Sequence, residues 1–364
     1  MRRALIGAGG LAALAGGGAW LLRRRDAAAY DRLAVETWRP PRMAPPLLRE
    51  LVRCATLAPN SHNTQPWRFA LAAEGLRLLP DPARRTPAVD PDDHHLFASL
   101  GCALETMLQA APVLGLRAEA AVDGAGIATL RVSPAPARGN DLAAAIARRH
   151  STRLPFDPAP LPAADLASLE QAGGADPAVG LVLVSAPAAR ATLAELIIAA
   201  NRAQIRDAAF VAELLSWIRF SHAAALARRD GLFAGSMGNP AVPEAIGRRI
   251  FPLVFTEAAE TRRLARLLDA TPAFAVLAAA EAGPRGWVAA GRAAQRLCLR
   301  ATALGLATSW VNQPVEVAAM RPALAALAGL GDRRPDFVLR LGRGPAAPPS
   351  LRRPPQDVMA EEQA

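Results

Sequence analysis

The longest apolar run lies at the amino terminus, where nineteen uncharged, mostly apolar residues, Ala4 to Leu22, have arginines on both sides. A helix of this length can cross a bilayer core of roughly 30 Å. Arg2 and Arg3 are also typical of a twin-arginine export signal, and Ala27 to Ala29 offers a small-residue cleavage site. We expect residues 1–28 to form a single uncleaved membrane anchor, with an exported and cleaved signal as the alternative. Because arginines flank both ends, the orientation stays open.

The rest of the chain alternates between helix-like and strand-like patterns. A polar turn at Glu74-Gly75 separates two apolar runs and predicts a β-hairpin. Asp92 or Asp93 is placed to cap the helix that follows, and Gly115 to end it. The spacing of apolar residues predicts helices at 47–57, 95–114 and 187–201, and strands within 67–79, at 180–184 and at 336–341.

An internal repeat relates two of these segments. Shifting the chain by 190 residues lays Gly101 on Gly291 and the sequence Leu114-Gly115-Leu116 on residues 304–306, with six identities in sixteen positions. Small residues along a helix let a neighbouring backbone approach closely, so we expect the two helices to pack together at a dimer-like centre. The repeat predicts two related halves, residues 45–145 and 146–345.

Two segments lack a clear period. Residues 201–257 carry several glycine-bearing turns, and long irregular segments inside a domain are often lids or binding loops, so we expect a lid here. The proline-rich residues 346–364 are expected to be a disordered tail.

Composition narrows the classes of function. With 364 residues, of which 52% are hydrophobic, the chain can bury a large core. The formal charge of +10 comes from arginines alone, without any lysine. The arginines are not clustered with aromatic residues as in nucleic-acid-binding proteins, so a membrane surface or an anionic cofactor is the expected partner and nucleic acid is not.

The sequence motifs do not support a metal site or a nucleophilic catalytic residue. Cys54, Cys102 and Cys298 lie among apolar or alanine-rich neighbours, without ligand spacing. His94 and His95 follow aspartates in a way that fits the start of a capped helix better than a metal site. The sequence also lacks a G-x-S-x-G elbow, a P-loop, an H-E-x-x-H motif and a dinucleotide-binding glycine motif after a strand.

The densest group of polar side chains lies in the loop from Ala58 to Trp67. Hydroxyl, amide and imidazole groups on one loop can satisfy many polar atoms of a flat, heteroatom-rich ligand. Read in order, this string resembles the flavin-contacting loop of the nitroreductase superfamily, and the histidine before an asparagine is most similar to the Acg-type branch. The resemblance assigns these candidate cofactor ligands: Asn60, Ser61, His62, Asn63 and Gln65.

A second group, Arg149-His150-Ser151-Thr152-Arg153, resembles the family's arginine, arginine, serine, any residue, arginine signature. Arginine can grip a phosphate or place positive charge beside a reduced flavin ring. Arg149, Ser151 and Arg153 are therefore candidate cofactor ligands, although His150 departs from the usual second arginine. Arg343 lies in a segment that resembles the family's terminal leucine-glycine turn and is a candidate phosphate ligand.

The resemblance covers about residues 45–345 and implies an α+β, nitroreductase-like fold with two pseudo-symmetric halves in one chain. The polar loop occurs only in the first half and the arginine signature only in the second, which implies one FMN site per chain in a monomer that imitates a dimer. The implied function is an FMN-dependent oxidoreductase that reduces electron-poor organic small molecules with NAD(P)H. The flavin would carry the chemistry, so no side chain is assigned as catalytic. The alternative is an FMN storage or sequestration protein under a closed lid.

Overall fold

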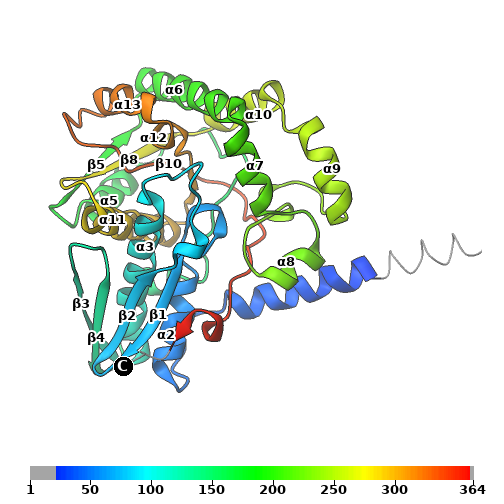
Figure 1. The fold of residues 1–364 in the computed structure, drawn as a ribbon. Coiled ribbons are helices and arrows are strands. Elements are labelled where there is room, and N and C mark those ends of the chain that lie inside the picture. The colour runs from blue at the N-terminus through cyan, green and yellow to red at the C-terminus, as the bar shows by residue number, and fades with distance from the viewer. Residues whose placement is uncertain (1–21, 361–364) are drawn as a thin grey trace, which may run out of the picture.

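A computed structural model describes residues 22–360 of the chain (Figure 1). The apolar run expected to cross a membrane lies outside these residues, apart from Leu22, and stays a prediction. Within the described range, the one helical stretch long and apolar enough to span a bilayer is His94–Leu114, and most of it is buried in the protein core.

The first half is built on an antiparallel sheet with one long helix against it. The predicted hairpin is formed by β1 (Trp67–Ala72) and β2 (Gly75–Pro80). Its other elements are α2 (Leu47–Thr56), α3 (His94–Ala110), β3 (Leu116–Val122), β4 (Ala128–Pro134) and α4 (Asp141–Ala145). The strands follow the order β1-β2-β4-β3, and α3 connects β2 to β3.

The second half repeats this arrangement with the order β5-β8-β10-β9, and α11 connects β8 to β9. Its main elements are α5 (Ala163–Gly173), β5 (Val179–Val184), β8 (Ala273–Ala279), α11 (Pro284–Ala303), β9 (Ala307–Trp310), α12 (Gln313–Glu316), α13 (Arg321–Leu327) and β10 (Phe337–Gly342). Strand β8 is buried along its whole length because the sheet lies between two apolar clusters. The architecture is therefore α+β, as predicted.

The two long helices α3 and α11 pack against each other at the centre, as the repeat predicts. A Cβ atom on Gly101 would lie 2.0 Å from the carbonyl oxygen of Val288, and one on Gly291 would lie 2.0 Å from that of Ala98. The two contacts are reciprocal, because a shift of 190 residues converts one pair into the other. Only glycine allows the two backbones to come this close.

A buried carboxylate adds a polar contact to this helix pair. Glu105 on α3 is 1% exposed and binds Arg292 and Arg296 of α11 at 3.3 and 2.9 Å. Removing either side of such a buried pair leaves an uncompensated charge.

The cap of α3 differs from the prediction. Asp93 adopts a left-handed conformation and makes no capping bond, and Asp92 pairs with Arg334 instead. The backbone amides of His95 and Leu96 donate to the carboxylate of Asp90, each at 3.0 Å. A tight turn at 90–93 brings this earlier aspartate over the helix end, which residue spacing alone does not reveal.

Residues 201–257 are mostly helical, contrary to the irregular segment that the sequence suggested. Between β5 and β8 the chain forms α6 (Pro187–Arg206), α7 (Ala208–Trp217), β6 (Ile218–Arg219), α8 (His222–Arg228), β7 (Leu232–Phe233), α9 (Glu244–Val254) and α10 (Glu257–Asp269). Asp207 and Ser221 cap α7 and α8 through their side chains, which explains how such short helices begin.

The prediction of a disordered tail is wrong for residues 346–360. Strand β11 (Met359–Ala360) pairs in parallel with β1 of the first half, and the side chains of Leu351 and Val358 are each 3% exposed. Burial of these apolar residues and backbone pairing hold the segment despite its prolines. The chain thus returns from the second half to the first.

Candidate functional site

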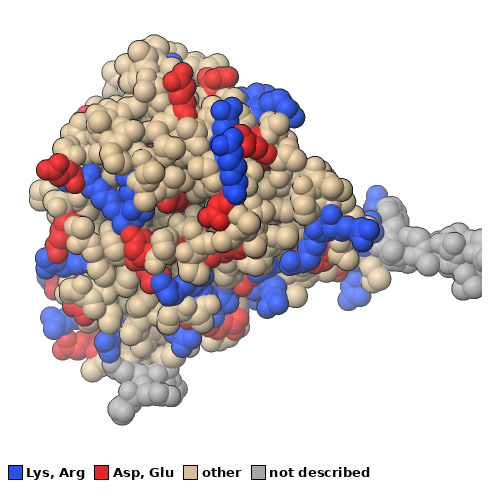
Figure 2. Space-filling model, turned by 45° about the horizontal axis from the view of Figure 1, so that its top comes forward, with Lys and Arg blue, Asp and Glu red and all other residues tan. Residues whose placement is uncertain are grey.

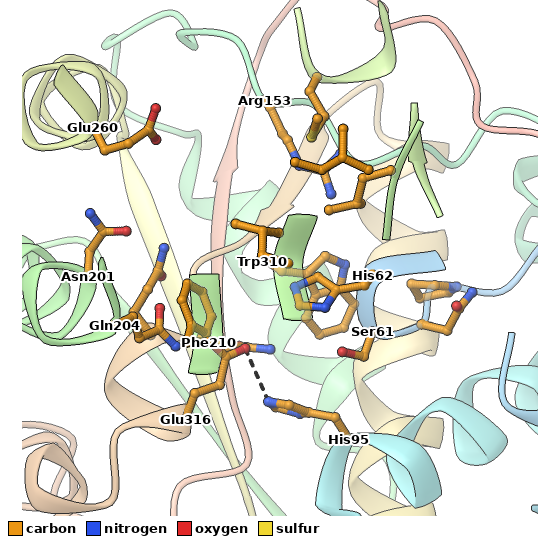
Figure 3. A pocket seen from close by; sticks show the side chains of 18 of the residues that line it. Ser61, His62, His95, Arg153, Asn201, Gln204, Phe210, Glu260, Trp310 and Glu316 are labelled. Atoms are coloured by element: carbon orange, nitrogen blue, oxygen red, sulfur yellow. Dashed lines mark hydrogen bonds and ion pairs between the residues drawn. The ribbon is translucent and has the colours of Figure 1, made fainter. Parts of the chain in front are cut away.

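Two adjoining cavities lie where the halves and the inserted helices meet. The larger has a volume of about 290 Å³ and the smaller about 60 Å³. Five residues line both and mark their common boundary: Pro59, Asn60, Arg153, Leu232 and Trp310. In Figure 3, Arg153 lies across the larger cavity from His95 and Glu316, with His62 and Trp310 between them.

The loop before β1 has an unusual backbone. His62, Asn63 and Gln65 have φ values of 46°, 54° and 54°, a region that residues with a side chain rarely occupy. The side-chain oxygen of Asn60 accepts a hydrogen bond from the amide of Gln65 at 2.8 Å and closes the loop. Such strained backbone persists only where surrounding contacts hold it, and it is common at functional sites.

Two amide side chains of this loop tie it to distant segments. The amide nitrogen of Asn63 donates to the carbonyl oxygens of Gly231 and Leu351, at 2.9 and 3.2 Å. The amide nitrogen of Gln65 donates to Arg229 and its oxygen accepts from the amide of Arg353, both at 2.8 Å. The loop, the inserted helices and the carboxyl-terminal segment therefore form one unit.

Most of the predicted site residues come together here. Asn60, Ser61, His62 and Arg153 line the larger cavity, and Asn60, Asn63, Arg149, Ser151 and Arg153 line the smaller. Gln65 lines neither cavity, since it is fully buried and holds the loop in place.

Arg343 is not brought to the site. It follows β10, lines neither cavity and binds Asp165 at 3.2 Å, with 46% of its side chain exposed. A guanidinium directed toward solvent and a carboxylate does not face a ligand in these cavities, so this arrangement gives the predicted phosphate role no support.

The smaller cavity is strongly basic. Among the described residues that line it, none is acidic, whereas Arg149, Arg153 and Arg352 all contribute. Arg149 donates to the carbonyl of Leu57 at 3.2 Å and Arg352 to that of Thr56 at 2.7 Å. Both carbonyls lie at the carboxyl end of α2, where the helix dipole favours positive charge.

Burial lowers the pKa of all three guanidinium groups, that of Arg352 to about 9 and that of Arg153 to about 10. They nevertheless keep their charge at neutral pH. The indole of Trp38 lies beneath two of them, 4.9 Å from Arg352 and 5.8 Å from Arg149. A cluster of guanidinium groups in a cavity that no described acidic residue lines is suited to a phosphate group.

Arg352 and Trp38 are site residues that sequence analysis missed. Arg352 lies in the presumed tail and Trp38 in the linker before the first half. One signal in the sequence indicates that this segment is folded. Leu351 precedes the pair Arg352-Arg353 among prolines, and an apolar residue beside two arginines is unusual for a segment without structure.

The opposite wall of the larger cavity carries an acidic network. The imidazole nitrogen Nε2 of His95 lies 3.3 Å from Glu316, and the amide of Gln204 donates to Glu316 at 2.6 Å. Burial opposes both charges, but the hydrogen bond between them lowers the pKa of Glu316 and raises that of His95. Both shifts favour the charged forms of the pair. By contrast, burial lowers the pKa of His62 to about 4, which keeps that ring neutral.

Several buried polar atoms along the cavities have no hydrogen-bond partner in the protein. The residues that line the cavities contribute Nδ1 of His62, Oδ1 of Asn63, a guanidinium nitrogen of Arg149, Nε2 of His150, Nδ2 of Asn201, Nε1 of Trp310 and Oε1 of Gln313. An unpaired buried polar atom costs about 1–3 kcal/mol, so a group of them indicates a ligand that pairs with them. The expected ligand has many hydrogen-bonding atoms and an anionic group at one end.

Metal binding has no comparable basis. Within residues 22–360, no group of three histidine, cysteine, aspartate or glutamate side chains could hold a metal ion. His94 pairs with Asp336 at 2.8 Å and thereby stabilises the start of α3.

Comparison with known proteins identifies the family. A model of the nitroreductase family matches residues 146–343. The Mycobacterium tuberculosis protein named "Putative NAD(P)H nitroreductase Rv3131" is 30% identical over 333 residues, which cover 84% of this chain and 89% of that protein. The protein named Acg from the same organism is 27% identical over 323 residues, with 85% and 94% covered.

Solved structures give more distant likenesses. The FMN-dependent nitroreductase NfnB of Mycobacterium smegmatis, in complex with NADPH, is 21% identical and covers 56% of this chain and 89% of its own, with a TM-score of 0.37. A nitroreductase with bound FMN from Desulfitobacterium hafniense is 16% identical, with 62% and 100% covered and a TM-score of 0.39. These likenesses are too weak to support an argument. On the family model and the similarity to the mycobacterial relatives, the chain belongs to the nitroreductase family.

Proposed function

We propose that this protein is an oxidoreductase that binds FMN in the two cavities and uses NAD(P)H to reduce electron-poor organic molecules. The observation that carries the proposal is the meeting of the polar loop near residue 60 with the arginines 149, 153 and 352 around a shared space. The names of the two mycobacterial relatives agree with a nitroreductase that uses NAD(P)H.

The lining residues fit the parts of FMN. The smaller cavity, with Arg149, Ser151 and Arg352, would hold the phosphate. Asn60, Ser61 and Asn63 would bind the ribityl chain and ring edges, and the unpaired oxygen of Asn63 is one available acceptor. FMN, when bound, supplies the hydride and electron transfer.

The side chains supply the electrostatic setting. Arg153 lies between the two cavities and would stabilise negative charge on a ring placed there. The neutral His62 would add a hydrogen bond without adding charge. The aromatic side chains of Phe210, Phe251 and Trp310 line the larger cavity and would provide flat apolar surfaces for a substrate.

We also propose that the two halves arose by duplication, so that one chain imitates a dimer and holds one site. The shared strand order and the reciprocal glycine contacts of α3 and α11 support this origin. We further propose that residues 1–28 tether the protein to a membrane, on the basis of the apolar run that arginines flank.

Purification of the full chain and its absorption spectrum test the function. We expect a yellow protein whose flavin absorbance is bleached when NADPH or NADH is added without oxygen. A yellow protein that neither nucleotide bleaches would instead favour storage of FMN, and a colourless protein that takes up no added FMN would refute both functions.

A pair of neighbouring arginines provides the matched variants. Arg149 is 2% exposed and lines the smaller cavity, whereas Arg148 is exposed. Arg149→Gln should weaken FMN binding by about 10- to 100-fold, because a hydrogen bond to a charged group contributes about 1.5–3 kcal/mol. Arg148→Gln and Arg343→Gln should bind FMN like the natural chain. Equal FMN affinity in all four proteins would refute the proposed phosphate site.

A further inference from the structure

Helix α9 carries an apolar stripe on its outer side. Ile246, Ile250, Leu253 and Val254 are 50%, 39%, 76% and 58% exposed. They follow each other at spacings of four, three and one, so they share one face of the helix. Half of the eight large exposed apolar residues in the described part of the chain belong to this one helix.

The inner side of α9 is fixed to the protein. A Cβ atom on Gly247 would lie 2.2 Å from the ring of Phe220, so the helix backbone lies directly on that ring. Phe251 packs edge-on against Phe220 and lines the larger cavity. The apolar stripe therefore cannot turn inward without breaking these contacts.

Positive charge accompanies the stripe. Arg249 is exposed on α9 next to the stripe. Arg248 is exposed on the opposite side of the helix, where it binds the one acidic residue of α9, Glu244, at 3.2 Å. A helix with an exposed apolar face and an arginine beside it is typical of elements that lie in a membrane interface.

The chain leaves its described part on the same side of the molecule. Phe220, which packs against Phe251 of α9, lies just before α8 in the chain. At the start of α8, His222 packs against Tyr30 of the N-terminal helix, residues 22–37, with 5.6 Å between the ring centroids. Helix α8 thus connects α9 to the N-terminal helix. In Figure 1, α9 and the outer end of that helix, at residue 22, both lie on the right. Arg23 and Arg25 are exposed near this point, and Figure 2 shows basic side chains around it.

We propose that the apolar stripe of α9 docks on the surface of a lipid bilayer, with Arg249 directed to anionic headgroups. This proposal rests on the proposed tether, because the run of residues 4–22 would hold α9 within reach of the bilayer it enters. A second copy of the chain fits the stripe less well, because a symmetric contact would bring two identical arginine-bearing helices together.

A fluorescent probe on α9 tests the docking in the full chain. Cys54, Cys102 and Cys298 are at most 2% exposed, so a thiol-reactive environment-sensitive dye would label an introduced cysteine. The test variant is Leu253→Cys and the matched control is Arg117→Cys on β3, at the far side of the molecule, where the side chain is 71% exposed. Both would be reconstituted in vesicles of phosphatidylcholine and phosphatidylglycerol.

We expect a blue-shifted emission at position 253 and quenching by nitroxide-bearing lipids at least about twofold stronger than at position 117. Equal, weak quenching at both positions would overturn the docking. A blue shift that needs no lipid and grows with protein concentration would also overturn it, because such a shift indicates that a second copy of the chain covers the stripe. Flavin content, measured on the same samples, tests FMN binding separately from the docking. A flavin-loaded protein that is in the vesicles but shows no quenching refutes the docking alone. A protein that the vesicles do not retain refutes the tether and the docking together.

Discussion

At the scale of single residues, the site depends on charges and rings held away from water. Arg149 and Arg352 keep positive charge in a buried place because the last carbonyls of α2 and the face of Trp38 partly replace their hydration. For His62, the charge of Glu316 offsets burial only in part, so the pKa falls to about 4 and the ring is neutral at pH 7. The same loop thus presents a hydrogen-bonding ring beside a cationic pocket.

The neutral state of His62 predicts a dependence of stability on pH. Burial lowers its folded pKa to about 4, below the 6.5 of an unfolded chain, so between these values the unfolded state binds more protons. The free energy of unfolding should therefore fall as pH decreases from 6.5 to 4. His62→Asn should reduce this slope by up to about 1.4 kcal/mol per pH unit, measured by urea unfolding.

Asparagine is the suitable replacement because it tolerates the left-handed backbone at position 62. His150, whose pKa burial lowers to about 3, contributes with the same sign in both proteins. An unchanged slope in the variant would show that His62 is protonated in the folded protein or exposed to water.

The sequence predicted those site residues that are neighbours in the chain. Asn60 to Asn63 and Arg149 to Arg153 each lie on one short segment, so their order could be read directly. Arg352 reaches the same cavity from almost 200 residues beyond Arg153, through burial and strand pairing that depend on the whole fold. Arg343 illustrates the opposite error, because local resemblance did not reveal that its side chain binds Asp165.

At the scale of helices and strands, the contact between α3 and α11 determines how the halves meet. Periodicity predicted both strands of the hairpin, and the repeat predicted the central helices, because these features leave a local pattern. The helices of the insertion leave a weaker pattern, since they are short and many of their apolar residues face the cavity or solvent.

The close helix contact predicts that Gly101→Ala and Gly291→Ala destabilise the protein. Alanine improves helix propensity by about 1 kcal/mol, but a Cβ atom 2.0 Å from a backbone oxygen should cost about 3 kcal/mol, the upper end of the usual range for overpacking. We expect a net loss near 2 kcal/mol in denaturant unfolding. Gly139→Ala is the control, because a Cβ atom there meets nothing within 4 Å. Similar stability of all three variants would contradict the packing of α3 on α11.

At the scale of the whole molecule, the carboxyl-terminal segment joins the second half to the first and completes the basic pocket. It brings Arg352 to the end of α2 and adds β11 beside β1. Its proline content predicted disorder, since composition does not record contacts with distant parts of the fold.

A chain that ends at Pro349 should therefore be less stable and bind FMN weakly. Loss of the buried Leu351 and Val358 should cost about 3 kcal/mol or more, and loss of Arg352 should raise the Kd for FMN at least about tenfold. Thermal unfolding and flavin fluorescence titration measure the two effects. A chain that ends at Ala360 is the control, because it keeps the described contacts. If both chains bind FMN equally, Arg352 is not a ligand.

The covalent connection between α3 and α11 has a thermodynamic consequence. In a homodimer, an interface between two such helices forms from separate chains, so dilution weakens it and the unfolding midpoint depends on protein concentration. Here both helices belong to one polypeptide, and their mutual effective concentration is fixed by the chain. The contact between the two helices should accordingly persist at any dilution, including the few copies of a protein present in a single cell.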